Sequence, residues 1–291
     1  MIFRTDLALE EKESLSGSLD GVRQETEDFE SCRVIRMKVD ASAADRLRKP
    51  AGTYITLELP PISDHIDGDD QYIRRTADEL RRLLPEEGLV LVAGIGNRSI
   101  TPDALGPAAV EQVLATRYIQ GELARVTGLD GLRPVAAVST GVLGNTGFES
   151  AELIAGLILE LDPAAVIAID ALAARDLSRL GCTVQLSDTG ISPGSGVQNA
   201  RTGLNRETLG VPVIGIGVPT VVDAATLALD LMSAPRDGWE EKISPRGAKM
   251  VVTPREVDLL VARSARLIAM AINLALNPQF TVEELTALAS R

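Results

Sequence analysis

The stretch LVLVAGIGNRSITPDALGP, residues 89–107, decides the fold. It opens with an apolar run at 89–95, continues as a loop with glycine and proline, and leads into a predicted helix at 107–120. A strand of a parallel sheet is covered on both faces, so it reads as a continuous apolar run of this kind. The stretch therefore predicts a strand, a loop at its carboxyl end, and a helix.

The same theme repeats through the centre of the chain. Further apolar runs occur at 135–138, 165–169, 183–186 and 211–216, and further helices are predicted at 149–161, 171–180 and 221–232. This alternation is typical of βαβ units. We predict an α/β fold, a three-layer sandwich around a largely parallel sheet.

The flanking segments extend this domain. Two alternating stretches predict a strand pair at 33–39 and 53–59, and helical spacing predicts an amphipathic helix over 70–84. Residues 233–249, with two prolines and two glycines, are predicted to form a surface connection, and a long helix continues to 277. At 291 residues the chain fits one large core.

Composition narrows the classes of function. Aromatic residues make up 3% of the chain, so the core must be built from Val, Ile, Leu and Ala. A formal net charge of -12 argues against direct nucleic acid binding and against anionic membranes, while it permits a cationic partner. Two cysteines without CxxC spacing suit a reducing cytosol. Without a predicted signal peptide or membrane span, we expect a cytoplasmic protein.

Two aspartates follow apolar runs, where ligands gather in open α/β sheets. Asp103 lies in TPDALGP (101–107), and Asp170 closes VIAID (166–170). Burial raises the pKa of such a carboxyl group, and two neighbouring carboxylates can share a proton, as acid/base hydrolysis requires. The same positions also suit helix caps, for helices beginning near Ala104 and Ala171.

Elimination favours the carboxylates. His65 is the single histidine, so a Ser-His-Asp or Cys-His site would depend on this one loop residue. A His-rich zinc site is excluded for the same reason, and we predict no metal site and no cofactor. The neighbouring carboxylates suit a weak hard-cation site, although a solvated acidic loop is the better interpretation; they are Asp64, Asp67, Asp69 and Asp70.

Three glycine-rich loops follow predicted strands. GIGN (94–97) has the start of a phosphate-binding turn, but Ser99 replaces the third glycine of GxGxxG. TGVLGNTG (140–147) and GISPGSG (190–196) can bring backbone amides close to a ligand, although tight turns explain them equally well. In the last loop, Gly194 and Ser195 are candidate substrate-binding residues.

Several long motifs in fixed order resemble the germination (spore) protease family, over the chain to about residue 277. They are GIGN (94–97) with TPDALGP (101–107), IAIDALAAR (167–175), SDTGISPGSGV (187–197), IGIGVPTVVDA (214–224) and VVTPREVD (251–258). The resemblance implies a phosphorylase/hydrolase-like fold, similar to that of the hydrogenase maturation proteases. It further implies an atypical aspartic endopeptidase that degrades small acid-soluble spore proteins during germination, as a homotetramer in the spore core. By motif, its two proposed catalytic aspartates fall on Asp103 and Asp170.

The family's members are zymogens, and RTDLALE (4–10) resembles their processing site. Cleavage between Asp6 and Leu7 would make residues 1–6 a removable propeptide and 7–291 the protease domain. Six residues are few to occlude a cleft, so we expect inactivity to be held by conformation or to be weak. An acidic residue before the cleaved bond calls for a basic side chain near the cleft, and Arg98 and Arg175 are the candidates.

Two other functions remain open on the residues alone. On the same fold, the two aspartates would instead be ligands of a metal-dependent maturation-type protease. Alternatively, the loops at Gly94 and Gly190 would belong to a phosphate- or nucleoside-binding α/β protein.

Overall fold

The computed structural model describes residues 5–15, 19–65, 70–119, 121–127, 129, 131–194, 201–231 and 250–289. Its strands are β1 (Val22–Asp28), β2 (Arg33–Val39), β3 (Gly52–Glu58), β4 (Val90–Ile95), β5 (Val135–Gly141), β6 (Ala165–Ala174), β7 (Thr183–Ser187), β8 (Val213–Asp223) and β9 (Val251–Val252). The predicted connection at 233–249 and residues 1–4 of the predicted propeptide lie outside the described residues.

The helices alternate with the strands as the sequence predicts, except that the helix predicted at 107–120 ends already at Val110. They are α1 (Ala8–Glu13), α2 (Ala41–Leu47), α3 (Ile62–His65), α4 (Asp70–Arg81), α5 (Leu105–Val110), α6 (Gly121–Thr127), α7 (Leu143–Thr146), α8 (Ser150–Leu161), α9 (Arg206–Leu209), α10 (Ala224–Leu231), α11 (Val257–Leu276) and α12 (Val282–Ala289). Two short 3₁₀ helices lie at Thr101–Asp103 and Leu177–Arg179.

One mixed sheet runs through the molecule in the order β1-β2-β3-β7-β8-β6-β4-β5, and β9 pairs with β8. Strands β5, β4, β6 and β8 are parallel, whereas β7, β3, β2 and β1 continue the sheet in antiparallel fashion. The predicted α/β class is therefore confirmed. Strand β7 is antiparallel to β8 because the link between β6 and β7 is short. A parallel strand would need a crossover that returns the chain to the edge of the sheet where β6 begins, and this link is too short for that.

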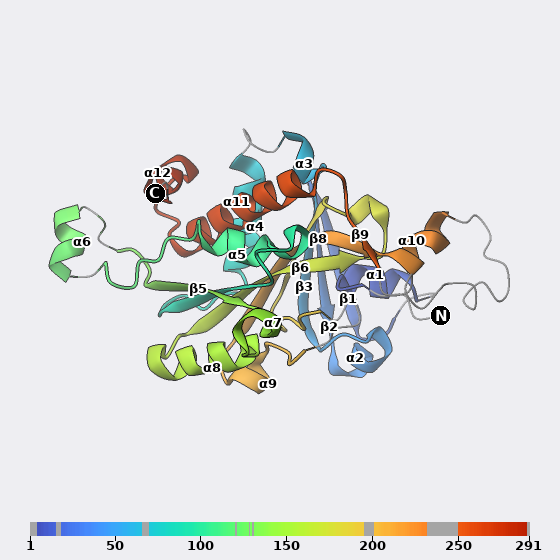
Figure 1. The fold of residues 1–291 in the computed structure, drawn as a ribbon, viewed down its shortest axis with the longest axis horizontal. Helices are drawn as coiled ribbons and strands as arrows, with labels where there is room; N and C mark the ends of the chain where they lie inside the picture. The colour runs from blue at the N-terminus through green and yellow to red at the C-terminus, as the bar shows by residue number, and fades with distance from the viewer. Residues whose placement is uncertain are drawn as a thin grey trace.

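Helices cover both faces of the sheet, which gives the three layers (Figure 1). On one face α4, α5 and α11 pack over the larger apolar cluster, and on the other α8 and α9 cover a smaller one. Helix α11 is long and apolar enough to cross a membrane by length and composition, but 78% of its apolar window is buried inside the protein.

The predicted helix at 171–180 is wrong, because β6 continues to Ala174. Its alanines favour a helix in isolation, yet residues 171–174 pair with 218–222 of β8, and this tertiary pairing overrides the local preference. The predicted helix at 221–232 likewise begins only at Ala224. Asp170 consequently lies inside a strand, and the explanation of Asp170 as a helix cap is excluded.

Strand β1 has no counterpart in the prediction. Its sequence VRQETED is polar, because nearly all of its side chains are exposed at the edge of the sheet. The predicted strand pair is confirmed as β2 and β3, and the amphipathic helix as α4. A strand with both faces in solvent leaves no apolar alternation to detect.

Helix α5 lies directly on the backbone of two central strands at Gly106. A Cβ at this position would stand 2.6 Å from the carbonyl oxygen of Ile169 in β6 and closer still to that of Ile95 in β4. The absence of a side chain therefore allows the loop before α5 to reach the centre of the sheet.

We expect Gly106→Ala to lower the free energy of unfolding by about 1–3 kcal/mol, because the new methyl group must displace backbone. Gly156→Ala is the matched control: it lies in α8 with nothing within 4 Å of its Cβ position, so it should raise stability by up to about 1 kcal/mol. Urea denaturation of both variants measures the difference. Equal effects of the two changes would contradict the close packing of α5.

Candidate active site

Asp170 is a buried carboxyl group in the middle of the sheet. Its side chain sits in β6 with 6% of the residue exposed, and its Oδ1 accepts a hydrogen bond of 2.9 Å from the N–H of Ala171. Burial raises the pKa of Asp170 well above its usual value, and the charges of Asp103 and Asp6 raise it further. The Ala171 N–H and the charge of Arg201 act in the opposite direction.

Asp103 approaches from the loop between β4 and α5. Its Oδ2 accepts a hydrogen bond of 2.7 Å from the N–H of Asn97, across a turn in which Gly96 has φ +120°. A side chain on Gly96 would collide with the Asp103 carbonyl oxygen, so the tight turn depends on glycine. The alternative explanation of Asp103 as a helix cap is excluded, because the N-terminus of α5 receives no side-chain cap.

The pKa of Asp103 is also raised, chiefly by burial. The Asn97 N–H and the charge of Arg201 partly offset this rise. The Asn97 N–H and the charge of Arg201 both favour the ionised form of Asp103, and Asp103 is less buried than Asp170. The two carboxyl groups therefore lie in different environments. Such a difference lets one carboxyl group hold a proton while its neighbour is ionised.

The structure brings Asp103 and Asp170 to one cavity of about 260 Å³, which we call the aspartate cavity. Its walls come from the carboxyl ends of β4 and β6, the 3₁₀ turn, the loop after β7 and strand β8. Asp6 and Arg201 also line it, as does the predicted residue Gly194. Ser195 lies outside the described residues.

The sequence did not reveal Arg201. It follows the GISPGSG loop without a motif of its own, and its proximity to both aspartates arises only from folding. By contrast, Arg98 pairs with Glu111 and lines neither cavity that contains Asp170. Arg175 lines a separate cavity, so the structure brings neither predicted arginine to the aspartates.

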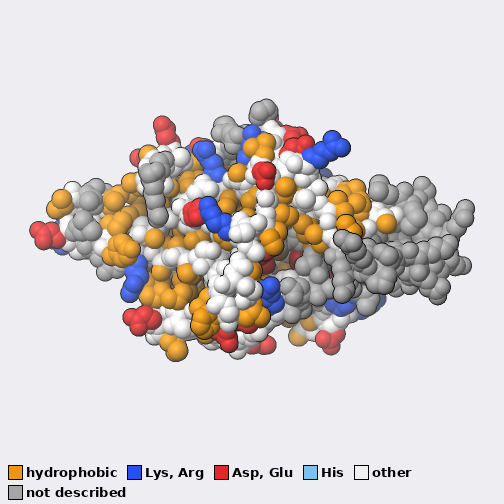
Figure 2. Space-filling model, in the orientation of Figure 1, with side chains coloured by type: hydrophobic (Ala, Val, Ile, Leu, Met, Phe, Trp, Pro, Cys, Tyr) orange, Lys and Arg blue, Asp and Glu red, His pale blue; other side chains and the backbone are white. Residues whose placement is uncertain are grey.

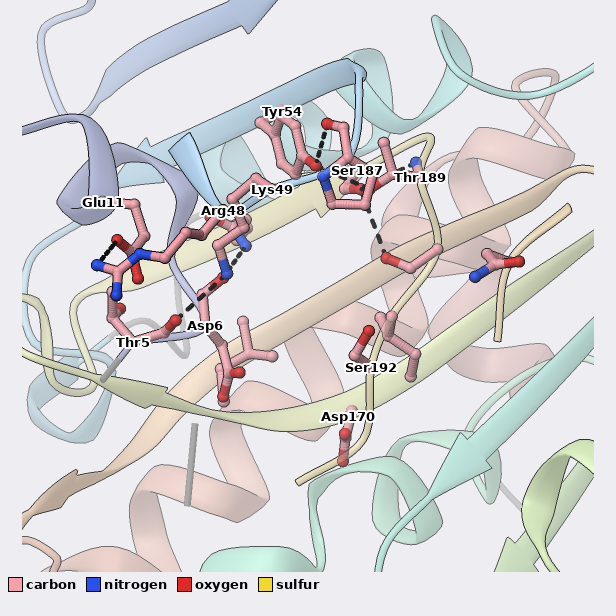
Figure 3. Close-up of a pocket in the computed structure, with 16 residues that line it drawn as sticks. Thr5, Asp6, Glu11, Arg48, Lys49, Tyr54, Asp170, Ser187, Thr189 and Ser192 are labelled. Carbon is pink, nitrogen blue, oxygen red and sulfur yellow. Dashed lines mark hydrogen bonds and ion pairs between the residues drawn. The ribbon is translucent and has the colours of Figure 1, made fainter. Parts of the chain in front are cut away.

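The N-terminal segment enters this site along β6. Asp6 donates its N–H to the carbonyl of Ala173 (2.9 Å), and the N–H of Ala173 donates to Asp6 Oδ2 (2.8 Å). A second cavity of about 350 Å³, the N-terminal cavity, is lined by Thr5, Asp6, Lys49 and Asp170 among others (Figure 3). Asp6 and Asp170 thus line both cavities.

The residues after Asp6 anchor the segment in the fold. Leu7 is fully buried in a cluster with Leu172 and Val222. Glu10 is 2% exposed, and its carboxylate accepts hydrogen bonds from the N–H groups of Arg175 and Asp176 (2.8 and 2.9 Å). The sequence predicts that six residues are few for occluding a cleft, yet Asp6 alone lines both cavities and Thr5 lines the N-terminal one.

In two of the glycine loops, a described amide next to a glycine is already bonded within the fold and does not face a ligand. The N–H of Asn97 in GIGN is bound to Asp103, and the N–H of Ile191 after Gly190 is bound to the carbonyl of Leu204. Over the described part of the chain, no group of three or more His, Cys, Asp or Glu is arranged to hold a metal ion. Residues 66–69 of the acidic loop lie outside that part.

The family model for germination protease matches residues 3–234. The germination protease of Caldanaerobacter subterraneus subsp. tengcongensis is 40% identical, over 98% of this chain and 97% of the relative. That of Clostridium acetobutylicum is 38% identical over 97% of each, and that of Bacillus cereus ATCC 10987 is 36% identical over 95% and 94%.

Among solved structures, the [NiFe] hydrogenase maturation protease HycI from Thermococcus kodakarensis KOD1 matches with a TM-score of 0.37 and 18% identity. The match covers 67% of this chain and 98% of that one. The sequence comparisons are far closer and span nearly the full length of each relative. The chain therefore belongs to the germination protease family and is a peptidase.

Proposed function

We propose that this protein is the endopeptidase that initiates degradation of small acid-soluble spore proteins during germination, in the cytoplasm of the spore core. It is made as a zymogen that cleaves itself after Asp6, and hydrolysis uses Asp103 and Asp170 without a cofactor. The observation that carries the proposal is that both carboxyl groups line one cavity together with Asp6, at the end of the processing segment.

The two carboxyl groups divide the chemistry by protonation. Two charges in one cavity repel, so the pair retains a proton. That proton belongs on Asp170, whose burial is deeper, while Asp103 keeps its charge beside the Asn97 N–H. Ionised Asp103 removes a proton from water as the water oxygen bonds to the peptide carbonyl carbon. In this step the C=O π electron pair moves onto the carbonyl oxygen, and it re-forms the C=O bond as the C–N bond breaks and Asp170 gives its proton to the leaving nitrogen. A proton then passes from Asp103 to Asp170, which restores the starting pair.

Inhibition of the zymogen follows from occupancy of the site. Thr5 and Asp6 line the N-terminal cavity, while Leu7 and Glu10 fix the segment to the fold. Loss of residues 1–6 would empty the part of both cavities that Asp6 now lines. The short propeptide thus acts by its position rather than by its size.

The charge and the exposed side chains of the surface support the proposed substrate and the proposed homotetramer. A chain with net charge -12 attracts basic, DNA-associated proteins over long range.

Strand β5 forms one end of the sheet, and Figure 2 shows hydrophobic side chains gathered on this face over β5 and α8. Tyr118, Phe148 and Leu159 are 74%, 55% and 89% exposed, which suits contacts between the subunits of a homotetramer.

Separate Asp103→Asn and Asp170→Asn changes should each lower kcat on a basic spore protein by about 10²–10⁴-fold, because each removes a proton-transfer group. The exposed Asp162→Asn is the control, since asparagine tolerates its left-handed conformation at φ 45°. Near-normal turnover in either variant would remove that residue from the mechanism.

Loss of activity in a chelator, restored by a divalent metal, would instead favour the metal-dependent alternative.

Incubation of the purified protein at mildly acidic pH should release residues 1–6, because acid favours the protonated form of Asp170. N-terminal sequencing should then begin at Leu7. The Asp170→Asn protein should retain Met1 under the same conditions. An intact Met1 in the wild-type protein, together with full peptidase activity, would contradict the zymogen.

The buried Asp170 should cost stability as pH rises. In the unfolded chain an aspartate ionises near pH 3.9, whereas the raised pKa of Asp170 delays ionisation in the folded protein. Between these two pKa values the unfolded state binds fewer protons, so stability falls with rising pH. The melting temperature of Asp170→Asn should therefore exceed that of the wild type increasingly above about pH 4. A gap that shrinks as pH rises would contradict the raised pKa.

A further inference from the structure

Two side chains hold the backbone on either side of the Asp6–Leu7 bond. Lys49 Nζ donates to the carbonyl oxygens of Thr5 (3.2 Å) and Asp6 (2.9 Å). Gln185 Nε2 also donates to the Asp6 carbonyl (3.0 Å), and Gln185 Oε1 accepts from the N–H of Ala8 (2.9 Å). Figure 3 shows Lys49 meeting the backbone of Asp6, whose carboxylate points away from Lys49.

Lys49 is aimed into the N-terminal cavity by the end of α2. Arg48 closes that helix in the left-handed conformation, with φ 55° and ψ 31°, and the N–H of Lys49 still bonds to the carbonyl of Ala44. Pro50 follows, and its carbonyl accepts a hydrogen bond from Tyr54 Oη (2.7 Å). A non-glycine residue in this conformation is strained, and strain of this kind often occurs at functional positions.

Gln185 comes from a different element and is also fixed. It lies within β7, is 8% exposed, and pairs with Gly217 of β8. Its carboxamide donates one hydrogen bond to the N-terminal segment and accepts one from it, so it binds the backbone in a single orientation. Together, the contacts of Lys49 and Gln185 fix the register of the bond relative to the sheet.

These contacts are made to backbone groups that any peptide carries. When residues 1–6 leave, Lys49 and Gln185 lose their carbonyl partners. Polar groups that are largely buried are costly to leave without hydrogen bonds, so the vacated position favours another peptide carbonyl. The charge of Lys49 also interacts with the carboxylate of Asp6.

We propose that Lys49 and Gln185 form the subsite for the acidic residue that precedes the cleaved bond, both in the chain's own N-terminus and in external substrates. This inference rests on the proposed function and names the residues that position its substrate. Gln185 and Lys49 hold the carbonyl of the acidic residue, and the Lys49 ammonium supplies the positive charge. The N–H of Ala173 donates a hydrogen bond to the acidic side chain, as it now does to Asp6 Oδ2.

The test uses two peptides, MIFRTDLALEEK and the same sequence with asparagine at position 6, with the self-processed protein. The wild type should favour the aspartate peptide in kcat/KM by about 10- to 100-fold, the range of a charge-assisted contact. Lys49→Met should bring this ratio close to one, chiefly by raising KM. The exposed Lys38→Met should retain the wild-type ratio.

Two further variants separate positioning from folding. Lys49→Arg keeps the charge and should keep a clear preference for aspartate. Gln185→Glu is isosteric, but it removes the donor and adds a like charge near the acidic residue, so it should harm the aspartate peptide more than the asparagine peptide. Because each result is a ratio within one protein, a smaller folded fraction does not change it.

The pH dependence gives a second measurement. Burial lowers the pKa of Lys49, while Asp6, Glu11 and Glu10 raise it and Arg48 lowers it further. The preference for aspartate should therefore fall with rising pH before an ordinary lysine loses its proton, and Lys49→Arg should abolish that fall.

The outcomes separate a failure of the proposed subsite from a failure of the proposed function. If the wild type cleaves neither peptide and no spore protein, the proposed function is wrong, and the subsite with it. If the wild type cleaves and prefers aspartate while Lys49→Met and Gln185→Glu show the same preference, the proposed function stands and the subsite is wrong. In that case the two side chains serve only to anchor the uncleaved N-terminus.

Discussion

The site depends on strand β6 extending beyond the point where its neighbour β4 ends. Strand β4 pairs with β6 only as far as Ile169, whereas β8 pairs with it as far as Ala174. The backbone beyond Asp170 is therefore held by the sheet on one side and is available to another segment on the other. Asp6 takes this place through its two bonds to Ala173. The same strand thus fixes a buried carboxyl group and binds the peptide chain beside it.

Burial of Asp170 is the cost of this arrangement. A carboxyl group inside a sheet is stable when neutral, and the nearby charges of Asp103 and Asp6 oppose its ionisation further. A structural aspartate would gain nothing from such an environment. An acid that must hold a proton during catalysis gains from it, so the costly burial of this carboxyl group coincides with the proposed chemistry.

The sequence predicted the parts of the fold that have a local signal. Apolar runs identified β4, β5, β6, β7 and β8, and the order of the motifs identified the family and predicted the two aspartates. Residues 171–174 misled the prediction because alanine favours helices locally, while pairing with β8 decides the outcome. Lys49, Gln185 and Arg201 had no signal, since their partners at Asp6 and Asp170 are distant in sequence and become neighbours only on folding.

Charge acts on two length scales in this molecule. The chain as a whole is strongly acidic, with a net charge of -12, yet the two cavities around Asp170 contain the cations Lys49 and Arg201. A field of many surface carboxylates acts over about a Debye length and attracts a basic protein irrespective of its sequence. A single ammonium in a confined cavity acts at short range, and under our proposal it favours one acidic residue within that protein. Because the first effect weakens with salt and the second much less, a basic substrate with an acid before the cleaved bond can be captured by one and aligned by the other.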